Sequence, residues 1–240
     1  MTRRSSSERR PPAQASGLTG TLAVVATPIG NLEDITLRAL RVLRECDVVV
    51  AEDTRRTRAL LTAHGIQRPL VSLPAHDERR RVPDIIDRLG AGETVALCTD
   101  AGTPAISDPG ATLILAARER GHVVTPVAGP SAVTAAVSAA GLSGDAFCFL
   151  GFLPRTPGKL IRILGAALGD GRTVVFFESP QRLAKTLRLA APVLGDRGVM
   201  VARELTKVHE TFHSGTAAEL ADEFTEHPPR GECTVLVAGR

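Results

Sequence analysis

The segment TVALCTDAGTPAISDPG, residues 94–110, decides the fold class. Its first five residues form a short aliphatic run, which is typical of a buried strand. The next twelve residues contain two glycines, two prolines and two aspartates, and a plain connection rarely needs so much special backbone geometry. In open α/β sheets, ligands bind in loops of this kind at the carboxyl ends of strands.

Short apolar runs alternate with helical patterns along the chain in both directions from this segment. We predict eight strands, at Thr21–Ala26, Asp47–Ala51, Thr94–Cys98, Val123–Val127, Ala146–Leu150, Thr173–Phe177, Gly198–Ala202 and Cys233–Ala238. We predict helices at Ile35–Arg44, Arg55–Ala63, Arg79–Leu89, Ala111–Arg120 and Ser131–Ala140. The pattern predicts an α/β fold, with parallel strands covered by helices on both faces.

The phenylalanines indicate two separate cores. All seven lie between residues 147 and 224, so the first half must build its core from aliphatic side chains. We therefore predict an N-terminal α/β domain at residues 18–129 and a C-terminal α/β domain at residues 130–240. A ligand cleft between the two domains is the default expectation.

The net charge of +3 resides in the first 17 residues, which hold four arginines and one glutamate. These residues are also rich in serine and proline, and we predict that they form a disordered basic tail. The rest of the chain is neutral, so the net charge gives no support for nucleic-acid binding by the folded part. Local arginine clusters can still contact phosphates.

Several common classes lack their sequence signals. The chain contains no GxGxxG dinucleotide motif after a strand, no GxxxxGK[ST] phosphate loop, no GxSxG elbow and no HExxH metal pair. The four cysteines are widely spaced, so we interpret them as reduced apolar residues and expect no metal site. No apolar run approaches the length of a membrane-spanning helix and the start lacks a signal peptide, which predicts a cytoplasmic protein.

Three loops that follow predicted strands are candidates for ligand binding. They are TPIGN at residues 27–31, DAGTP at residues 100–104 and GPSA at residues 129–132. Gly102 lets the main chain approach a ligand, Asp100 can accept hydrogen bonds from ribose hydroxyls or an ammonium, and Asp108 can cap the following helix. Ser131 is a candidate N-cap whose amide and hydroxyl groups could also bind a ligand. The alternative for the first loop is an ordinary βα turn, and the alternative for the third is that Ser131 only caps the helix.

Taken together, the motifs resemble one family. Seven segments occur in order along the chain and look like the ribosomal RNA small subunit methyltransferase I family: VATPIGNLEDITLRAL, AEDTRRTRALL, TDAGTPAISDPG, VAGPSAVTAAVSAAGL, GFLPR, FFESPQRL and ARELTKVHET. That family resembles the tetrapyrrole methylases, in which two α/β domains enclose S-adenosylmethionine and the chain forms a homodimer. The resemblance implies methylation of the 2′-oxygen of a cytidine in the decoding region of 16S rRNA, within the small ribosomal subunit.

The resemblance also implies which residues contact the cofactor. They lie in the three loops and in the second domain: Pro28, Ile29, Asp100, Ala101, Gly102, Thr103, Pro130, Ser131, Ala132, Phe177 and Leu205. Methyl transfer from a sulfonium needs no metal, because the methyl group is already activated. The protein must position the ribose oxygen and help to remove its proton.

Charged residues at strand ends supply candidates for that proton transfer and for RNA binding. Glu178, Glu204 and Lys207 are candidate bases, and a lysine can serve if desolvation lowers its pKa. Salt-bridged or exposed surface positions are the alternative for the two glutamates. Candidates for binding rRNA phosphates are Arg55, Arg56, Arg58 and Arg155.

Two other functions remain open at this point. A corrin-precursor methylase or a diphthamide-pathway methyltransferase would use the same cleft with a different acceptor. A non-catalytic RNA- or ribosome-binding protein would use the arginine clusters without a cofactor. The EDTRRTR and ELTKVHET segments favour the rRNA family.

Overall fold

The computed structural model describes residues 20–239, and its first sheet is parallel throughout. The strand order is β3-β2-β4-β1-β5, from β1 (Thr21–Val25), β2 (Val48–Ala51), β3 (Leu70–Ser72), β4 (Thr94–Cys98) and β5 (Val123–Val127). Short 3-10 helices lie at Leu32–Asp34 and Ala75–Asp77. The predicted basic tail, residues 1–17, lies outside the described residues.

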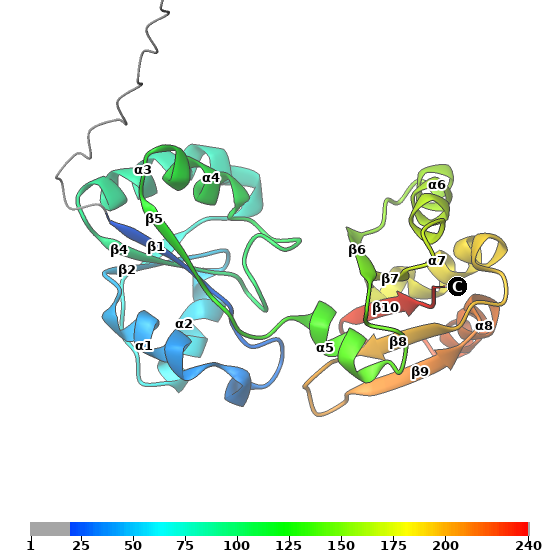
Figure 1. The fold of residues 1–240 in the computed structure, drawn as a ribbon. Coiled ribbons are helices and arrows are strands. Elements are labelled where there is room, and N and C mark those ends of the chain that lie inside the picture. The colour runs from blue at the N-terminus through cyan, green and yellow to red at the C-terminus, as the bar shows by residue number, and fades with distance from the viewer. Residues whose placement is uncertain (1–19, 240) are drawn as a thin grey trace, which may run out of the picture.

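Helices cover both faces of this sheet, as Figure 1 shows. On one face, α3 (Glu78–Gly90) and α4 (Ala111–Glu119) pack against Leu22, Val50 and Leu97. On the other face, α1 (Leu37–Glu45) and α2 (Thr54–Ala63) pack against Val25 and Val49. Successive strand residues point to opposite faces, so a sheet covered twice needs continuous apolar strands, as the sequence has.

The second sheet is mixed, with the order β6-β7-β10-β8-β9. Its strands are β6 (Phe147–Phe152), β7 (Thr173–Glu178), β8 (Val199–Arg203), β9 (Thr211–Gly215) and β10 (Cys233–Val237). One face packs on α6 (Pro157–Leu168), α7 (Pro180–Leu194) and α8 (Ala217–Glu226), and the other packs on α5 (Ala132–Ala139). Ile29 of the first domain joins the apolar cluster around α5, so the two domains touch there.

All eight predicted strands are present, but in the second sheet the prediction of parallel pairing holds only for β6 with β7 and is wrong for the other three pairings. There β10 runs antiparallel to both β7 and β8, and β8 pairs with β9 as an antiparallel neighbour. The sequence analysis also missed β3 and β9. The first has only three residues and the second, TFHSG, has only one large apolar side chain, so neither gives a clear periodic signal.

The prediction that Asp108 caps α4 is wrong. The N-cap residue is Gly110, and the carboxylate that caps the helix belongs to Glu78 at the start of α3. Its Oε1 accepts hydrogen bonds from the backbone N–H groups of Gly110, Thr112 and Leu113, at 3.1, 2.9 and 3.3 Å. Because Glu78 caps the helix, the side chain of Asp108 is not used as the cap and instead lines the interdomain cleft.

The cysteines behave as the spacing predicts. Cys46, Cys98 and Cys233 are buried, Cys148 is half-buried, and all four are free thiols. Burial raises the pKa of Cys46 to about 11 and that of Cys98 to about 12, so both remain neutral thiols. None of the helices within residues 20–239 is both long and apolar enough to cross a bilayer.

Candidate functional site

The three predicted loops meet because β4, β1 and β5 are neighbours in a parallel sheet. Thr27 and Gly102 exchange two backbone hydrogen bonds, with N···O distances of 2.8 and 3.0 Å, and the hydroxyl of Thr27 donates to the carbonyl of Thr99. The hydroxyl of Thr103 donates to the carbonyl of Pro130 at 3.2 Å. The TPIGN, DAGTP and GPSA loops therefore form one connected surface.

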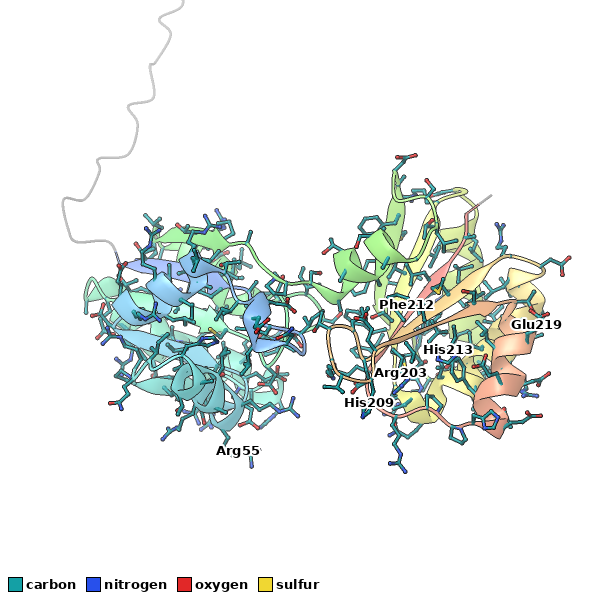
Figure 2. All side chains as sticks on the ribbon, turned by 90° about the horizontal axis from the view of Figure 1, so that it is seen from below. Arg55, Arg203, His209, Phe212, His213 and Glu219 are labelled. Carbon is teal, nitrogen blue, oxygen red and sulfur yellow. The ribbon has the colours of Figure 1, made fainter. Side chains whose placement is uncertain are left out.

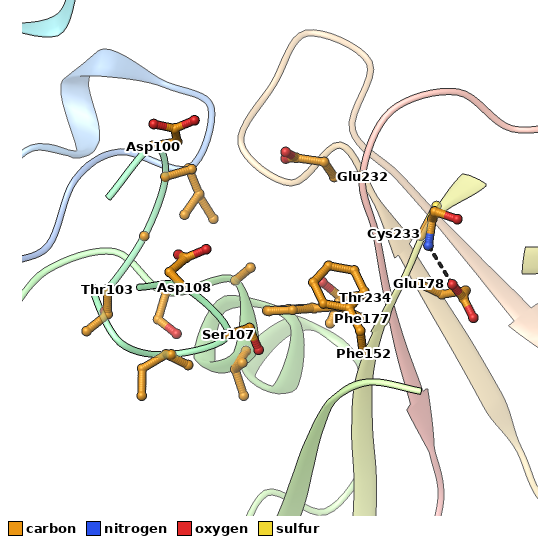
Figure 3. Close-up of a pocket in the computed structure, with 18 of the residues that line it drawn as sticks. Asp100, Thr103, Ser107, Asp108, Phe152, Phe177, Glu178, Glu232, Cys233 and Thr234 are labelled. Atoms are coloured by element: carbon orange, nitrogen blue, oxygen red, sulfur yellow. Dashed lines mark hydrogen bonds between the residues drawn. The ribbon is translucent and has the colours of Figure 1, made fainter. Parts of the chain in front are cut away.

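This surface forms one wall of a cavity of about 420 Å³ between the two domains, which we call the first cavity. The other wall comes from β6, from β7 with the residues after it, and from the start of β10, as the close-up in Figure 3 shows. A volume of this size is typical of a site for a small molecule or cofactor. The predicted cofactor-contacting residues that line it are Ile29, Asp100, Ala101, Gly102, Thr103, Ser131, Ala132 and Phe177.

Carboxylates dominate the charge of the first cavity. Arg56 is the single cation among its lining residues, which include five carboxylates: Glu52, Asp100, Asp108, Glu178 and Glu232. Burial raises the pKa of Asp108 and that of Glu52, and the nearby carboxylates raise both further. The hydroxyl of Thr99 donates to Asp108 at 2.8 Å and offsets part of this rise. Such a lining favours a cationic ligand.

Two phenylalanines form the apolar side of the first cavity. Phe177 packs against Phe149 with ring centroids 4.9 Å apart and against Phe152 at 5.5 Å. Phe152 is 58% exposed, and its ring lies beside that of Phe177 in the cavity (Figure 3). A partly exposed aromatic pair in a cavity that also holds carboxylates suits a ligand with one flat apolar part and one charged part.

The loops around the cleft hold strained backbone. Ala105 and Ser107 have φ values of 66° and 65°, and Glu204 and Thr206 have values of 51° and 66°. Residues other than glycine seldom adopt this region, and such strain is concentrated at functional sites. Ala105 and Ser107 lie in the TPAISDPG loop, which lines the first cavity, and Glu204 and Thr206 lie in the RELTK loop, whose Lys207 lines a neighbouring hollow.

Lys207, a candidate base, lies in an ion-pair cluster at the edge of the cleft. Its Nζ donates to Glu204 at 2.8 Å and to Glu232 at 3.0 Å. Burial lowers the pKa of Lys207, but the two carboxylates outweigh burial and raise its pKa overall. The lysine is therefore held as an ammonium, which is the opposite of what a general base requires.

The carboxylates of the other two candidate bases, Glu178 and Glu204, already accept hydrogen bonds and form ion pairs. Glu178 lines the first cavity but is 2% exposed, and it accepts hydrogen bonds from the backbone N–H of Ser179 at 2.8 Å and the hydroxyl of Thr186 at 2.7 Å. Arg182 pairs with the same carboxylate at 3.3 Å. The hydrogen bond from Lys207 is the main cause that lowers the pKa of Glu204.

The remaining predicted residues lie around the first cavity or outside it. Leu205 is buried in the interdomain cluster with Ile29, and Pro28 lies in a neighbouring hollow. Of the four arginines, Arg56 alone lines the cleft, where its Nε lies 3.5 Å from Asp100. Arg55 pairs with Asp53 and projects away from the first domain (Figure 2), and Arg58 and Arg155 are exposed outside the cavities.

Sequence reasoning missed the residues that come from the start of β10. Gly231, Glu232, Cys233 and Thr234 line the first cavity, yet they precede a strand rather than follow one. Since β10 is antiparallel to β7 and β8, its amino end lies beside their carboxyl ends. Gly231 has φ +83°, and a Cβ there would lie 2.1 Å from the carboxylate carbon of Glu204. The sequence signal that could have indicated these residues is Gly231 followed by the charged Glu232, directly before the strand.

Comparison of the sequence with known proteins identifies the family. The sequence profile of the tetrapyrrole (corrin/porphyrin) methylases matches residues 21–221. Ribosomal RNA small subunit methyltransferase I from Thermotoga maritima is 46% identical over 221 residues, covering 92% of this chain and 99% of that protein. The protein of the same name from Pseudomonas aeruginosa is 50% identical over 224 residues, covering 92% and 79%.

The chain belongs to the ribosomal RNA small subunit methyltransferase I family. Solved structures agree on the fold of this methyltransferase. The structure of a cobalt precorrin-4 methyltransferase has a TM-score of 0.70 at 19% identity, covering 95% of this chain and 98% of that one. The two-domain α/β fold of the tetrapyrrole methylases is thereby confirmed.

S-adenosylmethionine is the methyl donor of this family, and the first cavity fits it. The molecule carries a sulfonium and an ammonium, which the cavity carboxylates would attract. Gly102, at φ +82°, exposes backbone to the cavity, because a Cβ there would meet only Ile29 and the carbonyl of Pro130 at 3.4 and 4.0 Å. The aromatic pair of Phe152 and Phe177 offers an apolar surface for the adenosine.

Proposed function

We propose that this methyltransferase transfers a methyl group from S-adenosylmethionine to the ribose 2′-hydroxyl of a cytidine in the decoding region of 16S rRNA, within the small ribosomal subunit. The single observation that carries the proposal is the acidic interdomain cavity in a chain 46% identical to a ribosomal RNA small subunit methyltransferase I. The ordered motifs of the resemblance support the finer choice of acceptor.

The residues that would hold the cofactor come from both domains, which we take as residues 18–129 and 130–240. One side of the first cavity is formed by Ile29, by Asp100 to Thr103 and by the GPSA turn, and the other side is formed by Phe177. Pro28, Pro130 and Leu205 support these loops without lining the first cavity. Ser131 is the N-cap of α5 but makes no side-chain capping bond, so its hydroxyl is available to a ligand.

S-adenosylmethionine supplies a methyl group that its sulfonium charge has already activated. The chain must therefore orient the acceptor hydroxyl, exclude water and take up the hydroxyl proton. Lys207 is held protonated, and the carboxylates of Glu178 and Glu204 already accept hydrogen bonds from other side chains. Another carboxylate of the first cavity is therefore a better proton acceptor. The raised pKa values of Glu52 and Asp108 make them stronger bases than exposed carboxylates.

The test is to map 2′-O-methyl groups on 16S rRNA from cells with and without this gene, and to add the purified protein to the unmethylated small subunits. We expect one cytidine in the decoding region to lose its methyl group and to regain it with the protein and cofactor. An unchanged methylation map would refute the acceptor assignment. Single-turnover rates of Asp108→Asn and Glu52→Gln, compared with Glu178→Gln, then identify the proton acceptor.

The same experiment separates the alternatives. Diphthine synthase and corrin methyltransferases share the fold at 16% and 19% identity, which is too low to transfer their acceptors. A non-catalytic ribosome-binding protein would show no heat of binding with S-adenosylmethionine in calorimetry. We also propose that the protein is cytoplasmic and that it forms a homodimer. Light scattering of the purified protein tests the homodimer.

A further inference from the structure

A second cavity of about 360 Å³ adjoins the first. It is bounded by the TPIGN loop, by α2 and by the side chains of Lys207 and Glu232. Five residues line both cavities: Ile29, Arg56, Asp100, Ala101 and Glu232. The two spaces therefore meet at one junction in the cleft between the domains.

The two cavities differ in charge. Arg56 and Lys207 are the only cations among the residues that line either one, and both line the second cavity. The second cavity has two carboxylates, Asp100 and Glu232, so its formal charges balance, whereas the first cavity has an excess of carboxylates. A polyanion entering the cleft would be repelled by the first cavity and tolerated by the second.

Both cations can reach an incoming anion. The side chain of Arg56 is 68% exposed, and its closest ionic partner in the described chain is Asp100, at 3.5 Å from Nε. Its terminal NH groups make no hydrogen bond within residues 20–239, which leaves them able to bind a phosphate. Lys207 is 29% exposed, and the side chain of its second partner, Glu232, is 70% exposed.

The rest of the second cavity is aliphatic. Pro28, Leu32, Ala59 and Leu60 line it, and Leu32 is 48% exposed. An apolar surface beside two cations matches a nucleotide, which has an apolar face on its base and a charged phosphate at its other end. A site for unpaired RNA has these two parts, a surface for the base and cations for the backbone.

We propose that the second cavity binds the nucleotide that receives the methyl group, as part of a single-stranded stretch of RNA. Arg56 and Lys207 hold its phosphates, Leu32 and Ala59 contact its base, and its ribose lies at the junction with the first cavity. This assignment rests on the proposed function and names the subsite for its acceptor. It also gives Lys207 a binding role that agrees with its protonated state.

The test fills the second cavity without touching the first. Ala59 lines only the second cavity, is exposed on α2 and can accept a tryptophan without disturbing the core. Ala59→Trp is compared with Ala63→Trp, because Ala63 is exposed on the same helix one turn later and lines neither cavity. Lys207→Met is a second probe, and Arg56→Gln is compared with Arg118→Gln, because Arg118 is exposed on α4 and lines neither cavity.

Three quantities are measured for each variant: the affinity for S-adenosylmethionine by calorimetry, the affinity for a single-stranded ribo-oligonucleotide at several salt concentrations, and KM and kcat with small subunits. We expect Ala59→Trp and Lys207→Met to bind the cofactor normally and to weaken oligonucleotide binding by about tenfold. Loss of one phosphate contact should reduce the salt slope by about 0.7 in Lys207→Met and in Arg56→Gln. The control variants should match the wild type.

The outcomes separate this assignment from the proposed function. If the wild type methylates small subunits but Ala59→Trp and Ala63→Trp have equal KM values, the second cavity is not the acceptor subsite. Weaker binding of subunits with unchanged oligonucleotide binding would indicate a ribosomal protein as the occupant and would also overturn it. If the wild type itself methylates no RNA, the proposed function fails first.

Discussion

Gly30, in the TPIGN loop, is predicted to be essential for the fit between the two domains. A Cβ at this position would lie 2.4 Å from Cγ of Lys207, 2.9 Å from the carbonyl oxygen of Leu205 and 2.9 Å from Oγ1 of Thr206. Carbon atoms pack at about 3.5 to 4.0 Å, so in Gly30→Ala the facing RELTK loop must retreat by roughly 1 Å. Overpacking of this kind costs about 1 to 3 kcal/mol.

In a chain of this size, that cost should lower the melting temperature by about 2 to 10 °C. The retreat also widens the cleft, so we expect calorimetry to show weaker binding of S-adenosylmethionine by about tenfold, since misplacing contacts by roughly 1 Å has costs of this order or larger. Differential scanning calorimetry with and without cofactor measures both effects.

The matched control is Gly158→Ala, in the first turn of α6, where a Cβ would meet no heavy atom within 4 Å. Alanine favours a helix over glycine, so this variant should melt at the wild-type temperature or slightly above it. If Gly30→Ala keeps both the wild-type melting temperature and the wild-type cofactor affinity, the close contact between the TPIGN and RELTK loops does not exist in solution.

Three further predictions concern single side chains. Glu78→Ala removes the acceptor for three N–H groups at the start of α4 and should cost about 1 to 2 kcal/mol in urea unfolding, whereas the exposed neighbour Arg79→Ala should cost little. The pKa of Asp108 is raised in the folded protein, so its ionisation lowers stability as pH rises through that pKa; Asp108→Asn should melt higher than the wild type near neutral pH, lose this advantage in acid, and bind cofactor less tightly. Melting curves from pH 3 to 8 check the sign, and an advantage that grows in acid would contradict it. Phe177→Leu loses two ring contacts worth about 1 to 3 kcal/mol together and should weaken cofactor binding in calorimetry, unlike Phe212→Leu on the exposed β9.

The first domain could be predicted from the sequence almost completely. Its central strands β1, β2 and β4 are apolar runs because they are covered on both faces. The loops after β1, β4 and β5 carry glycine, proline and aspartate in dense groups. A parallel sheet brings all its carboxyl ends to one edge, so the loops that hold the first cavity follow directly from strand order along the chain.

The second domain could not be predicted in the same way. Strand direction depends on pairing between distant segments, and an apolar run such as CTVLV looks the same whether its neighbours are parallel or antiparallel. For this reason Glu232, at the amino end of β10, was absent from the predicted site. The cap of α4 by Glu78 was missed for a related reason, because 32 residues separate the carboxylate from the N–H group of Gly110.

The sequence by itself determined the two-domain α/β fold, the loops of the first domain that line the first cavity, and the family. Only the tertiary structure decided the state of the charged groups, because each charge depends on neighbours from other elements. Lys207 is held as an ammonium by Glu204 and Glu232, from two different strand ends, and Asp108 faces the cleft because Glu78 caps the helix in its place. Pairing and burial between distant segments set these pKa values, and a linear sequence does not contain the distances on which they depend.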